Sequence, residues 1–519
     1  MPRSFLHRNW DISSAPDSAT SGGAGKGNRN SAIYADEKSD APIVPKKPPN
    51  KAQAAEVVEE RGAAKSNAGE TPAYRTQGRA SASKGLEGVR EVAKRKGNER
   101  FTALLHHITP SLLVESFYDL NKTAAAGVDW KTWTDYEEQL YGRVHELHRE
   151  INTGAYRALP SRRVYIPKAD GKQRPLGVAA IEDKIVQQAV VKVLSVIYEE
   201  EFLGFSYGFR SGRGQHDALD ALTVGITKRN IGWVLDADIS AFFDTIDHDW
   251  MMRFLSHRIA DKRILRLVQK WLKAGTIEDG RRVAAERGTP QGAVISPLLA
   301  NIYLHYVFDL WAHQWRKTKA GGDIVVIRYA DDSVMGFQFE DEATRFLAAL
   351  QERLAKFGLT LHPEKTRLIE FGRYAAIRRE RRDSGAPETF DFLGFTHCCS
   401  QTRGGWFTIL RLTVKKRMRA TLVKIREALK RRRHEPIAML GEWLRRVVQG
   451  YFNYHAVPGN LKRLGGFREA VIELWRKALL RRSQRSNLPW RKFKQLVKEF
   501  IPSVRQMHPY PSQRFRVKT

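Results

Sequence analysis

The stretch DIVVIRYADDSVMGF, residues 323–337, has an apolar run on either side of two adjacent aspartates. The first run, residues 324–327, is short and entirely β-branched, which is typical of a buried strand. The sequence therefore predicts a strand, a tight turn at residues 329–332 and a second short strand. Carboxylates at Asp331 and Asp332 would repel each other, and crowding them is unfavourable unless cations neutralise them. For this pair alone, the alternative is an ordinary polar turn.

A second stretch, VLDADISAFFDTIDH at residues 234–248, also ends an apolar strand in acids. Asp236 and Asp238 share one strand face because side chains alternate with a period of two. Asp244 and Asp247 follow on an expected helix. Magnesium prefers oxygen ligands such as carboxylates and substrate phosphates, and two metal ions can clamp a phosphoryl group during transfer. Together the two stretches favour such a site, although spacing alone does not tell which acids bind metal.

The charge of the chain indicates a polyanionic partner. Its 519 residues include 88 Lys and Arg against 57 Asp and Glu, a net charge of +31. Nucleic acid is the first candidate for a chain this basic. The only cysteines, Cys398 and Cys399, are adjacent, which excludes a disulfide framework and a cysteine zinc module. The chain has no signal-peptide pattern and no bilayer-spanning run, so we expect a soluble, cytoplasmic protein with no membrane contact.

Composition divides the chain into three parts. Residues 1–84 are rich in Ser, Ala, Gly, Pro and Lys without an apolar period, and we expect a disordered tail. Residues 85–400 mix helix and strand patterns without regular alternation, including a strong helix at residues 185–198, and predict an α+β fold. Residues 401–519 hold 30 Lys and Arg against six Glu and no Asp, a net charge of +24. Amphipathic patterns there predict a basic helical domain that contacts nucleic acid.

Several blocks of the chain, taken in order, resemble one protein family. Asp-Ile-x-x-Phe-Phe-Asp followed by Tyr-Ala-Asp-Asp is similar to the polymerase core of reverse transcriptases, and more specifically to the bacterial group II intron-encoded reverse transcriptase–maturases that lack an endonuclease domain. The resemblance runs from about residue 98 to about residue 500. The matching blocks are AAGVD (125–129), IPKADGKQRPLGV (166–178), SYGFRSGRGQHDAL (206–219), DADISAFFDTIDH (236–248), GTPQGAVISPLLANIYL (288–304), RYADD (328–332), GLTLHPEKT (358–366) and FDFLGF (390–395).

This resemblance implies a right-hand polymerase, with fingers and palm at residues 85–400 and a thumb with maturase region at residues 401–519. It implies that Asp238, Asp331 and Asp332 are catalytic and hold two Mg²⁺ ions, which Mn²⁺ can replace. Tyr329 and Ala330 complete that motif. It also implies that Lys365 protonates the leaving pyrophosphate. The alternative for Lys365 is a surface lysine in a salt bridge.

The same resemblance implies a binding site for deoxynucleoside triphosphates. Lys168 and Arg174 would grip the triphosphate from a turn at Asp170-Gly171. Phe243 would lie under the sugar and exclude a 2′-hydroxyl, and Gln291 would contact the nucleotide from the other side. The alternatives are a solvated surface for the basic residues, strand-to-helix packing for Phe243 and a turn amide for Gln291.

The implied activity is RNA-directed DNA polymerisation, a nucleotidyl transfer from dNTPs to a primer 3′-hydroxyl. As an intron maturase the protein would also assist splicing and retrohoming, with an RNA template, intron RNA, and a DNA primer or target as partners. A free-standing relative acting in DNA repair or antiphage defence is the alternative. A maturase with a decayed polymerase is disfavoured by the complete set of acids, and an RNA-dependent RNA polymerase by Phe243 and the YADD form.

The chain departs from the family pattern in places. Trp130 stands where the family usually has Gly after GVD, and the long Ser- and Ala-rich N-terminal segment is unusual. No cysteine follows Cys399, so we expect no zinc-dependent endonuclease. The adjacent His397, Cys398 and Cys399 cannot wrap one ion and are interpreted as packing. The interleaved aromatics of the basic region are expected to be mostly helix core: Trp443, Tyr451, Phe452, Tyr454 and Trp475.

Overall fold

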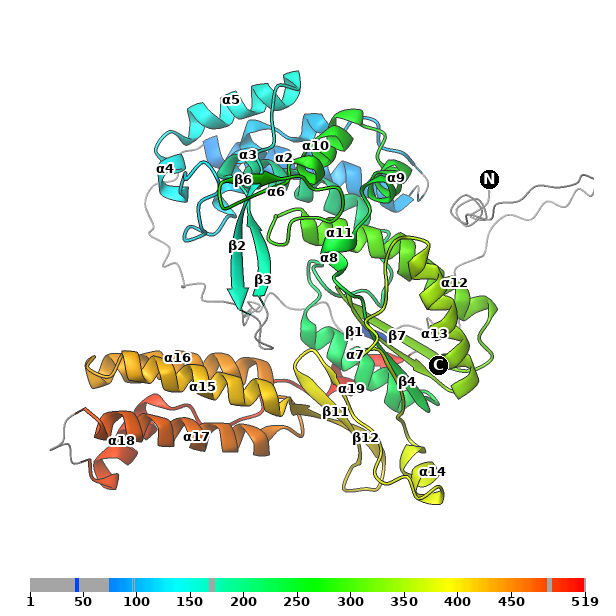
Figure 1. The fold of residues 1–519 in the computed structure, drawn as a ribbon, viewed down its shortest axis with the longest axis vertical. Coiled ribbons are helices and arrows are strands. Elements are labelled where there is room, and N and C mark those ends of the chain that lie inside the picture. The colour runs from blue at the N-terminus through cyan, green and yellow to red at the C-terminus, as the bar shows by residue number, and fades with distance from the viewer. Residues whose placement is uncertain are drawn as a thin grey trace, which may run out of the picture.

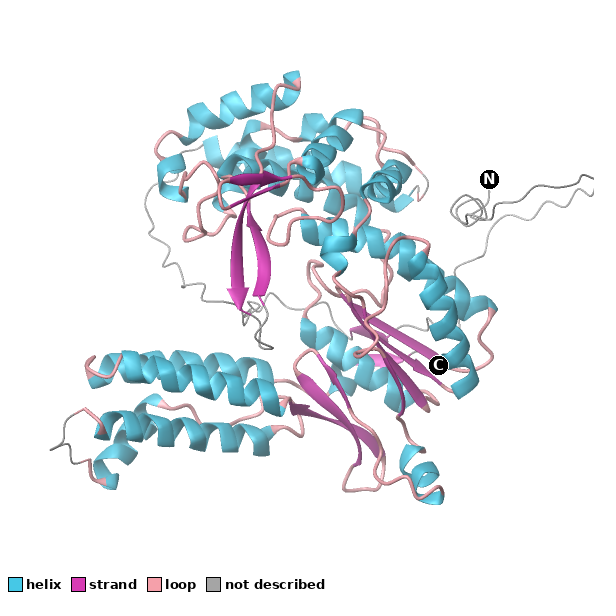
Figure 2. Cartoon of the chain, viewed as in Figure 1, coloured by secondary structure: helices cyan, strands magenta, loops and turns pink. Residues whose placement is uncertain are grey.

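The computed structural model describes residues 43–45, 74–95, 97, 99–167, 173–482 and 488–517. Helices and strands are mixed without regular alternation (Figure 2), so the predicted α+β class is confirmed. Figure 1 shows three groups of elements: a helical unit with a projecting hairpin, a four-stranded sheet flanked by helices, and a helical bundle that extends to the same side as the hairpin.

The N-terminal helical unit surrounds helix α6. α6 contacts α2 and α3, and its predicted apolar face is buried, with Ile185 and Val190 at 0% exposure. α2 begins at Tyr74, earlier than the expected start of order near Gly85. The other elements of the unit contribute to the same core. The elements are α2 (Tyr74–Arg95), η1 (Leu105–His107), α3 (Pro110–Tyr118), α4 (Trp133–Glu137), α5 (Leu140–Thr153), α6 (Ile181–Tyr198), α9 (His248–Arg258) and α10 (Lys262–Lys273).

A small sheet of order β3-β2-β5-β6 is attached to this unit. β2 (Ser161–Pro167) and β3 (Gln173–Val178) form an antiparallel hairpin, which projects away from the helices toward the bundle (Figure 1). β5 (Thr276–Glu278) pairs in parallel with the start of β2, and β6 (Arg281–Val283) completes the sheet. Within this sheet, the hairpin is therefore paired to a further strand only at its base.

The four-stranded sheet has the order β7-β8-β4-β9 and is buried on both faces. Alternate strand residues enter two separate cores, so that Leu235 packs with one core and Val234 with the other. Helix α13 contacts β4 and β8, whereas α7 contacts β7. Burial on both faces explains the almost continuous apolar character of the strands. The elements are α7 (Gln215–Lys228), β4 (Trp233–Asp238), α8 (Phe242–Thr245), α11 (Ser296–Leu304), the π-helix η2 (His305–Asp309), α12 (Leu310–Thr318), β7 (Ile324–Tyr329), β8 (Asp332–Phe337), α13 (Glu340–Ala355) and β9 (Arg367–Glu370).

A three-stranded antiparallel sheet, β10-β11-β12, leads from this sheet into the bundle. The expected domain boundary at residue 400 falls inside β11, so the bundle itself begins at Lys415. The bundle has its own apolar core, which includes Tyr451, Phe452 and Trp475 as expected. The elements are α14 (Ala375–Arg381), β10 (Phe390–Phe392), β11 (Phe395–Gln401), β12 (Phe407–Thr413), α15 (Lys415–Arg431), α16 (Ile437–His455), α17 (Leu461–Leu480) and α18 (Trp490–Phe500).

The C-terminal segment returns from the bundle to the four-stranded sheet. Arg514 in α19 (Pro511–Arg514) donates to Asp220 on α7 at 2.8 Å, and Arg411 on β12 donates to the same carboxylate at 2.5 Å. β13 (Phe515–Val517) then pairs with β1 (Ile43–Pro45). Two arginines on one buried carboxylate thus fasten the three-stranded sheet and the C-terminal segment to α7.

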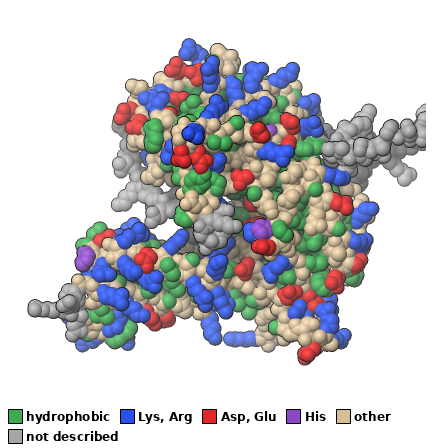
Figure 3. Space-filling model, in the orientation of Figure 1, with side chains coloured by type: hydrophobic (Ala, Val, Ile, Leu, Met, Phe, Trp, Pro, Cys, Tyr) green, Lys and Arg blue, Asp and Glu red, His purple; other side chains and the backbone are tan. Residues whose placement is uncertain are grey.

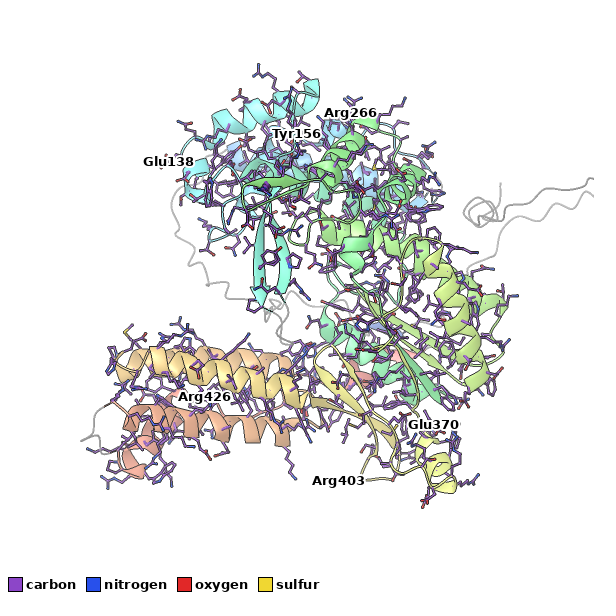
Figure 4. The ribbon with its side chains drawn as sticks, in the orientation of Figure 1. Glu138, Tyr156, Arg266, Glu370, Arg403 and Arg426 are labelled. Carbon is purple, nitrogen blue, oxygen red and sulfur yellow. The ribbon has the colours of Figure 1, made fainter. Side chains whose placement is uncertain are left out.

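Lys and Arg side chains cover much of the bundle surface in the face shown by Figure 3. Figure 4 labels Arg426 on α15 and Arg403 at the tip of the β11–β12 hairpin. Throughout the described ranges, each helix is either too short or too polar to cross a lipid bilayer.

Candidate active site

The turn between β7 and β8 has the tight form that the sequence predicts. Tyr329 pairs with Asp332 across the two strands, so that Ala330 and Asp331 alone make the turn. Ala330 has a φ of 57°, in the left-handed region that a residue with a Cβ rarely adopts. Asp331 therefore stands at the tip of the hairpin, and Asp332 begins β8.

Strand β4 brings a third carboxylate to the same end of the sheet. β4 lies between β8 and β9, and its last residue, Asp238, is directly opposite Asp332. Directly opposed side chains lie on one face of an antiparallel pair, with Cβ atoms roughly 5 Å apart. Strand register thus gathers the three acids that the sequence analysis singled out.

The surroundings of Asp331 and Asp332 oppose their ionisation. Burial, followed by the charges of Asp331 and Asp238, raises the pKa of Asp332 to about 6. Burial and the charge of Asp238 also raise the pKa of Asp331, whereas Arg174 and Arg328 lower it. Negative charge at this end of the sheet is incompletely compensated by the protein, so a bound cation would be stabilised here.

Lys365 provides part of the missing positive charge. Its Nζ donates to Asp238 Oδ2 at 2.6 Å, and this hydrogen bond is the main reason why its pKa is raised. The segment that carries Lys365 is fixed to β4, since the His362 amide donates to the Asp238 carbonyl at 2.7 Å. The Lys365 side chain is 60% exposed and so remains accessible to a ligand.

The donor chemistry of the three acids fits a hard divalent cation such as Mg²⁺, which prefers carboxylate oxygens. The raised pKa values of Asp331 and Asp332 reflect burial first and then the charge of the neighbouring carboxylates, which such an ion would neutralise. Among the described residues, however, no three acidic, His or Cys side chains are already arranged closely enough to hold a metal ion.

Phe243 lies in α8, directly after the strand that ends in Asp238. Its ring is half-buried and meets Phe242 edge-on, with centroids 5.4 Å apart. Its carbonyl accepts from the Thr289 amide at 2.8 Å. Gly288 has a φ of 82°, and a Cβ there would lie 2.9 Å from the carbonyl oxygens of Phe243 and Asp244. The GTPQG loop at residues 288–292 thus packs directly on the backbone of Phe243.

The same loop joins the sheet to the β2–β3 hairpin. The Gln291 carbonyl accepts from the Gly177 amide on β3 at 2.7 Å. Gly292 approaches this strand so closely that a Cβ would lie 3.0 Å from the Gly177 carbonyl oxygen. The side chain of Gln291 is half-buried, and the hairpin base and Phe243 are both tied to its loop.

Arg174 lies on β3, opposite Ile166, and its side chain is exposed. Its charge is close enough to the turn to lower the pKa of Asp331. Lys168 and the expected turn at Asp170-Gly171 lie outside the described residues, so only Arg174 of this predicted pair is located.

Arg328, immediately before the turn, is a residue that the sequence analysis quoted without assigning a role. It is 1% exposed and donates to Asp309 Oδ1 at 2.7 Å and Oδ2 at 2.5 Å. It also donates to the carbonyl of Ala330 at 2.9 Å, to Asn301 Oδ1 at 3.0 Å and to Ser206 Oγ at 2.7 Å. A charged residue inside an apolar strand run was the signal that could have found it.

A loop from another part of the chain supports the turn from outside. Tyr207 donates its amide to the Arg328 carbonyl at 2.9 Å, and Asn301 Nδ2 donates to the Gly208 carbonyl at 2.7 Å. A Cβ on Gly208 would lie 2.2 Å from the Ala330 amide nitrogen. Only glycine fits there, because the SYGF block at residues 206–209 lies directly against the turn.

The interpretation of residues 397–399 as packing agrees with the structure. His397 is fully buried and stacks on Phe390, with ring centroids 4.7 Å apart and an interplanar angle of 6°. Burial lowers the pKa of His397 to about 3, so the ring is neutral at ordinary pH. Cys398 and Cys399 lie beside it on β11.

Comparison with known proteins identifies the region that carries these acids. Residues 166–397 match the family described as Reverse transcriptase (RNA-dependent DNA polymerase). Protein YkfC of Escherichia coli (strain K12) is 42% identical over 191 residues, covering 36% of this chain and 50% of that protein.

The names of two further relatives refer to introns. Group II intron-encoded protein LtrA of Lactococcus lactis subsp. cremoris is 35% identical over 228 residues, covering 42% of this chain and 37% of that protein. An uncharacterised 91 kDa protein in the cob intron of Schizosaccharomyces pombe is 39% identical over 162 residues, covering 31% of this chain and 20% of that protein. The chain therefore spans half or less of the length of these relatives.

Proposed function

The chain belongs to the family of group II intron reverse transcriptases and maturases, and we propose that it is an RNA-directed DNA polymerase that adds deoxynucleotides to a primer 3′-hydroxyl. The observation that carries this proposal is the register that sets Asp238 opposite Asp332, beside Asp331 at the turn. Three crowded carboxylates at one end of a buried sheet suit metal-assisted phosphoryl transfer.

We assign the parts of a right hand as follows. The N-terminal helical unit with its β2–β3 hairpin serves as the fingers, and the four-stranded sheet with its helices serves as the palm. The bundle from α15 onward serves as the thumb and maturase region. In support, Arg417 in the first turns of α15 is close enough to the acids to lower the pKa of Asp332.

In this proposal Asp238, Asp331 and Asp332 hold two Mg²⁺ ions, or Mn²⁺ in their place. When bound, such ions lower the pKa of the primer hydroxyl and stabilise charge on the departing pyrophosphate. Arg174 and Lys168 bind and orient the triphosphate. Their positive charges suit that task because charge-assisted hydrogen bonds to phosphate are strong.

The remaining site residues select the deoxynucleotide and assist the release of pyrophosphate. The half-buried ring of Phe243 lies under the sugar and excludes a ribose 2′-hydroxyl by steric conflict. Gln291 contacts the nucleotide from a loop that is already tied to Phe243. Lys365 holds Asp238 in the free enzyme and gives its proton to the pyrophosphate oxygen as the latter leaves.

Primer extension on an RNA template tests the polymerase. Asp331→Ala is expected to lose activity on the order of a thousandfold, because a charge-stabilising group at the reacting phosphate is removed. Asp341→Ala is the matched control, since Asp341 is 72% exposed on α13 and forms a local ion pair with Arg345. The catalytic assignment is wrong if Asp331→Ala extends the primer as well as the control does.

We propose as the biological role that the protein is an intron maturase, supported by the basic bundle and by the intron-encoded relatives. The test is splicing of the RNA transcribed from the gene with its flanking DNA, at low magnesium, beside an unrelated structured RNA of equal length. Selective splicing supports a maturase. Asp331-dependent DNA synthesis without any splicing would instead favour a free-standing polymerase of DNA repair or antiphage defence.

A further inference from the structure

Trp130 combines two features that are unfavourable in a folded chain. Its side chain is 70% exposed, although an indole ring is largely apolar. Its backbone φ is 55°, in the left-handed region where glycine is unrestrained and a residue with a Cβ is strained. Packing within the described part of the chain explains neither feature, which directs attention to a contact with another molecule.

The ring is held in position before any ligand arrives. The guanidinium of Arg162 lies 4.9 Å from the centroid of the Trp130 ring. Arg162 is itself fixed, because it donates to the Ala126 carbonyl through Nη2 at 2.8 Å and through Nε at 3.2 Å. Gly127 packs so closely on the start of α6 that a Cβ would lie 2.5 Å from the Ala180 Cα. A preorganised aromatic surface loses little entropy when it binds.

The location of Arg162 relates this ring to the proposed active site. Arg162, Val164 and Ile166 alternate along β2 and therefore share one face of the hairpin. Leu176 and Arg174 on β3 lie directly opposite Val164 and Ile166 and share that face as well. Along this face, basic side chains therefore lie on either side of apolar ones. Arg174 is opposite Ile166, which is four residues from Arg162, so the two arginines are about 13 Å apart along the hairpin at about 3.3 Å per residue.

The charge around the ring suits a nucleotide strand. Lys131 beside Trp130 is exposed, and Arg162 covers part of the ring. Two acids lie nearby, and both are half-buried: the charge of Asp129 acts on Lys184, and Glu182 interacts with Lys131. An unpaired base offers a flat face to an indole while its phosphate meets a basic side chain, and this pairing is tolerant of sequence.

We propose that Trp130 is the stacking platform for an unpaired base of the template strand, ahead of the position where the incoming nucleotide pairs. A distance of about 13 Å corresponds to about four stacked nucleotides at 3.4 Å each. The inference rests on the proposed polymerase function, because that function implies that a template nucleic acid passes beside Arg174.

Binding of RNA–DNA primer–templates that differ only in their template overhang tests the platform. We expect Trp130→Gly to weaken binding of a duplex with a six-nucleotide 5′ overhang about tenfold, in line with the loss of one stacked base. Binding of the blunt duplex stays unchanged, and Trp130→Phe retains most of the affinity. Trp406→Ala is the control, because Trp406 is 78% exposed at the tip of the β11–β12 hairpin.

Trp130→Gly removes backbone strain, so its thermal midpoint is expected to equal or exceed that of the wild type, and misfolding does not explain a loss. Equal binding by Trp130→Gly and wild type, or equal weakening of overhang and blunt duplex, overturns the proposal.

A fluorescent base locates the contact and separates this inference from the polymerase assignment. 2-Aminopurine about four nucleotides into the overhang is expected to be quenched by wild type and by Trp406→Ala but not by Trp130→Gly. Quenching that persists in Trp130→Gly refutes the platform. If wild type quenches but extends no primer, the polymerase proposal fails, and Trp130 still binds an unpaired base. If wild type extends primers and Trp130→Gly still binds and quenches normally, only the platform fails.

Discussion

Arg328 provides the most direct test of how the turn at Ala330 and Asp331 is held. Replacing it by lysine keeps a positive charge beside the buried carboxylate of Asp309. It removes the planar fork that reaches Ala330, Asn301 and Ser206 at the same time. A single ammonium group cannot satisfy acceptors in so many directions.

The size of the effect follows from these contacts. Loss of two or three hydrogen bonds at about 1 kcal/mol each lowers the free energy of unfolding by about 2–3 kcal/mol. Complete removal of the charge would leave Asp309, which is 0% exposed, unpaired at a cost of about 3–5 kcal/mol. For this reason Arg328→Lys is a better variant than Arg328→Ala. A shift of the turn by about 1 Å would lower the rate of the chemical step about 100-fold.

The assay compares single-turnover primer extension by Arg328→Lys and Arg353→Lys. Arg353 is also buried, and it donates to the carbonyls of Val307 at 3.1 Å and Tyr306 at 3.2 Å, which do not belong to the turn. Both variants are expected to lose stability, but only Arg328→Lys is expected to lose rate, with little change in KM for dNTP. Equal rates in the two variants would refute a positioning role for Arg328.

Three further predictions concern selectivity, proton transfer and acid stability. Phe243→Ala is expected to raise ribonucleotide incorporation relative to deoxynucleotide incorporation at least tenfold, as measured by competing rNTP and dNTP, because the ring no longer excludes the 2′-hydroxyl; an unchanged ratio would point to simple packing. Lys365→Leu is expected to slow single-turnover extension about 10²-fold and to alter its pH profile, and an unchanged rate and profile would remove the general-acid role. Burial lowers the pKa of His397 to about 3, below its unfolded value of about 6.5, so the unfolded state binds an extra proton between these pH values. The free energy of unfolding should therefore fall with falling pH, by up to about 1.4 kcal/mol per pH unit for this group. In thermal melts between about pH 4.5 and 7, His397→Phe should show a weaker dependence of the melting temperature on pH than the wild type, and the same dependence in both proteins would contradict this reasoning.

Local patterns in the sequence predicted much of the fold correctly. The apolar run before Asp331, the helix at residues 185–198 and the helices of the basic region all appear where their periodicity indicated. The domain boundary that composition predicts at residue 400 falls within β11, and the first helix of the bundle begins at Lys415.

The composition of the candidate site was also predictable, but its assembly was not. A family resemblance points to Asp238, Asp331 and Asp332, and the pairing of β4 with β8 brings them to one end of the sheet. The role of Arg328 was not predicted, because nothing in the neighbouring sequence indicates which residue a single arginine beside a motif pairs with. Its partner, Asp309, lies on a π-helix that periodicity did not indicate.

The sequence by itself determined which segments become strands and helices, where the acids lie along them, and that the chain is strongly basic. These properties are local, because the spacing of apolar residues and the charge are set by residues within a few helical turns or one strand. Only the tertiary structure decided the register of Asp238 against Asp332, the contact of Lys365 with Asp238, and the strained exposure of Trp130 beside Arg162. Those arrangements join residues that are distant in the chain, and their free energy comes from packing and charge that exist only when the chain has folded.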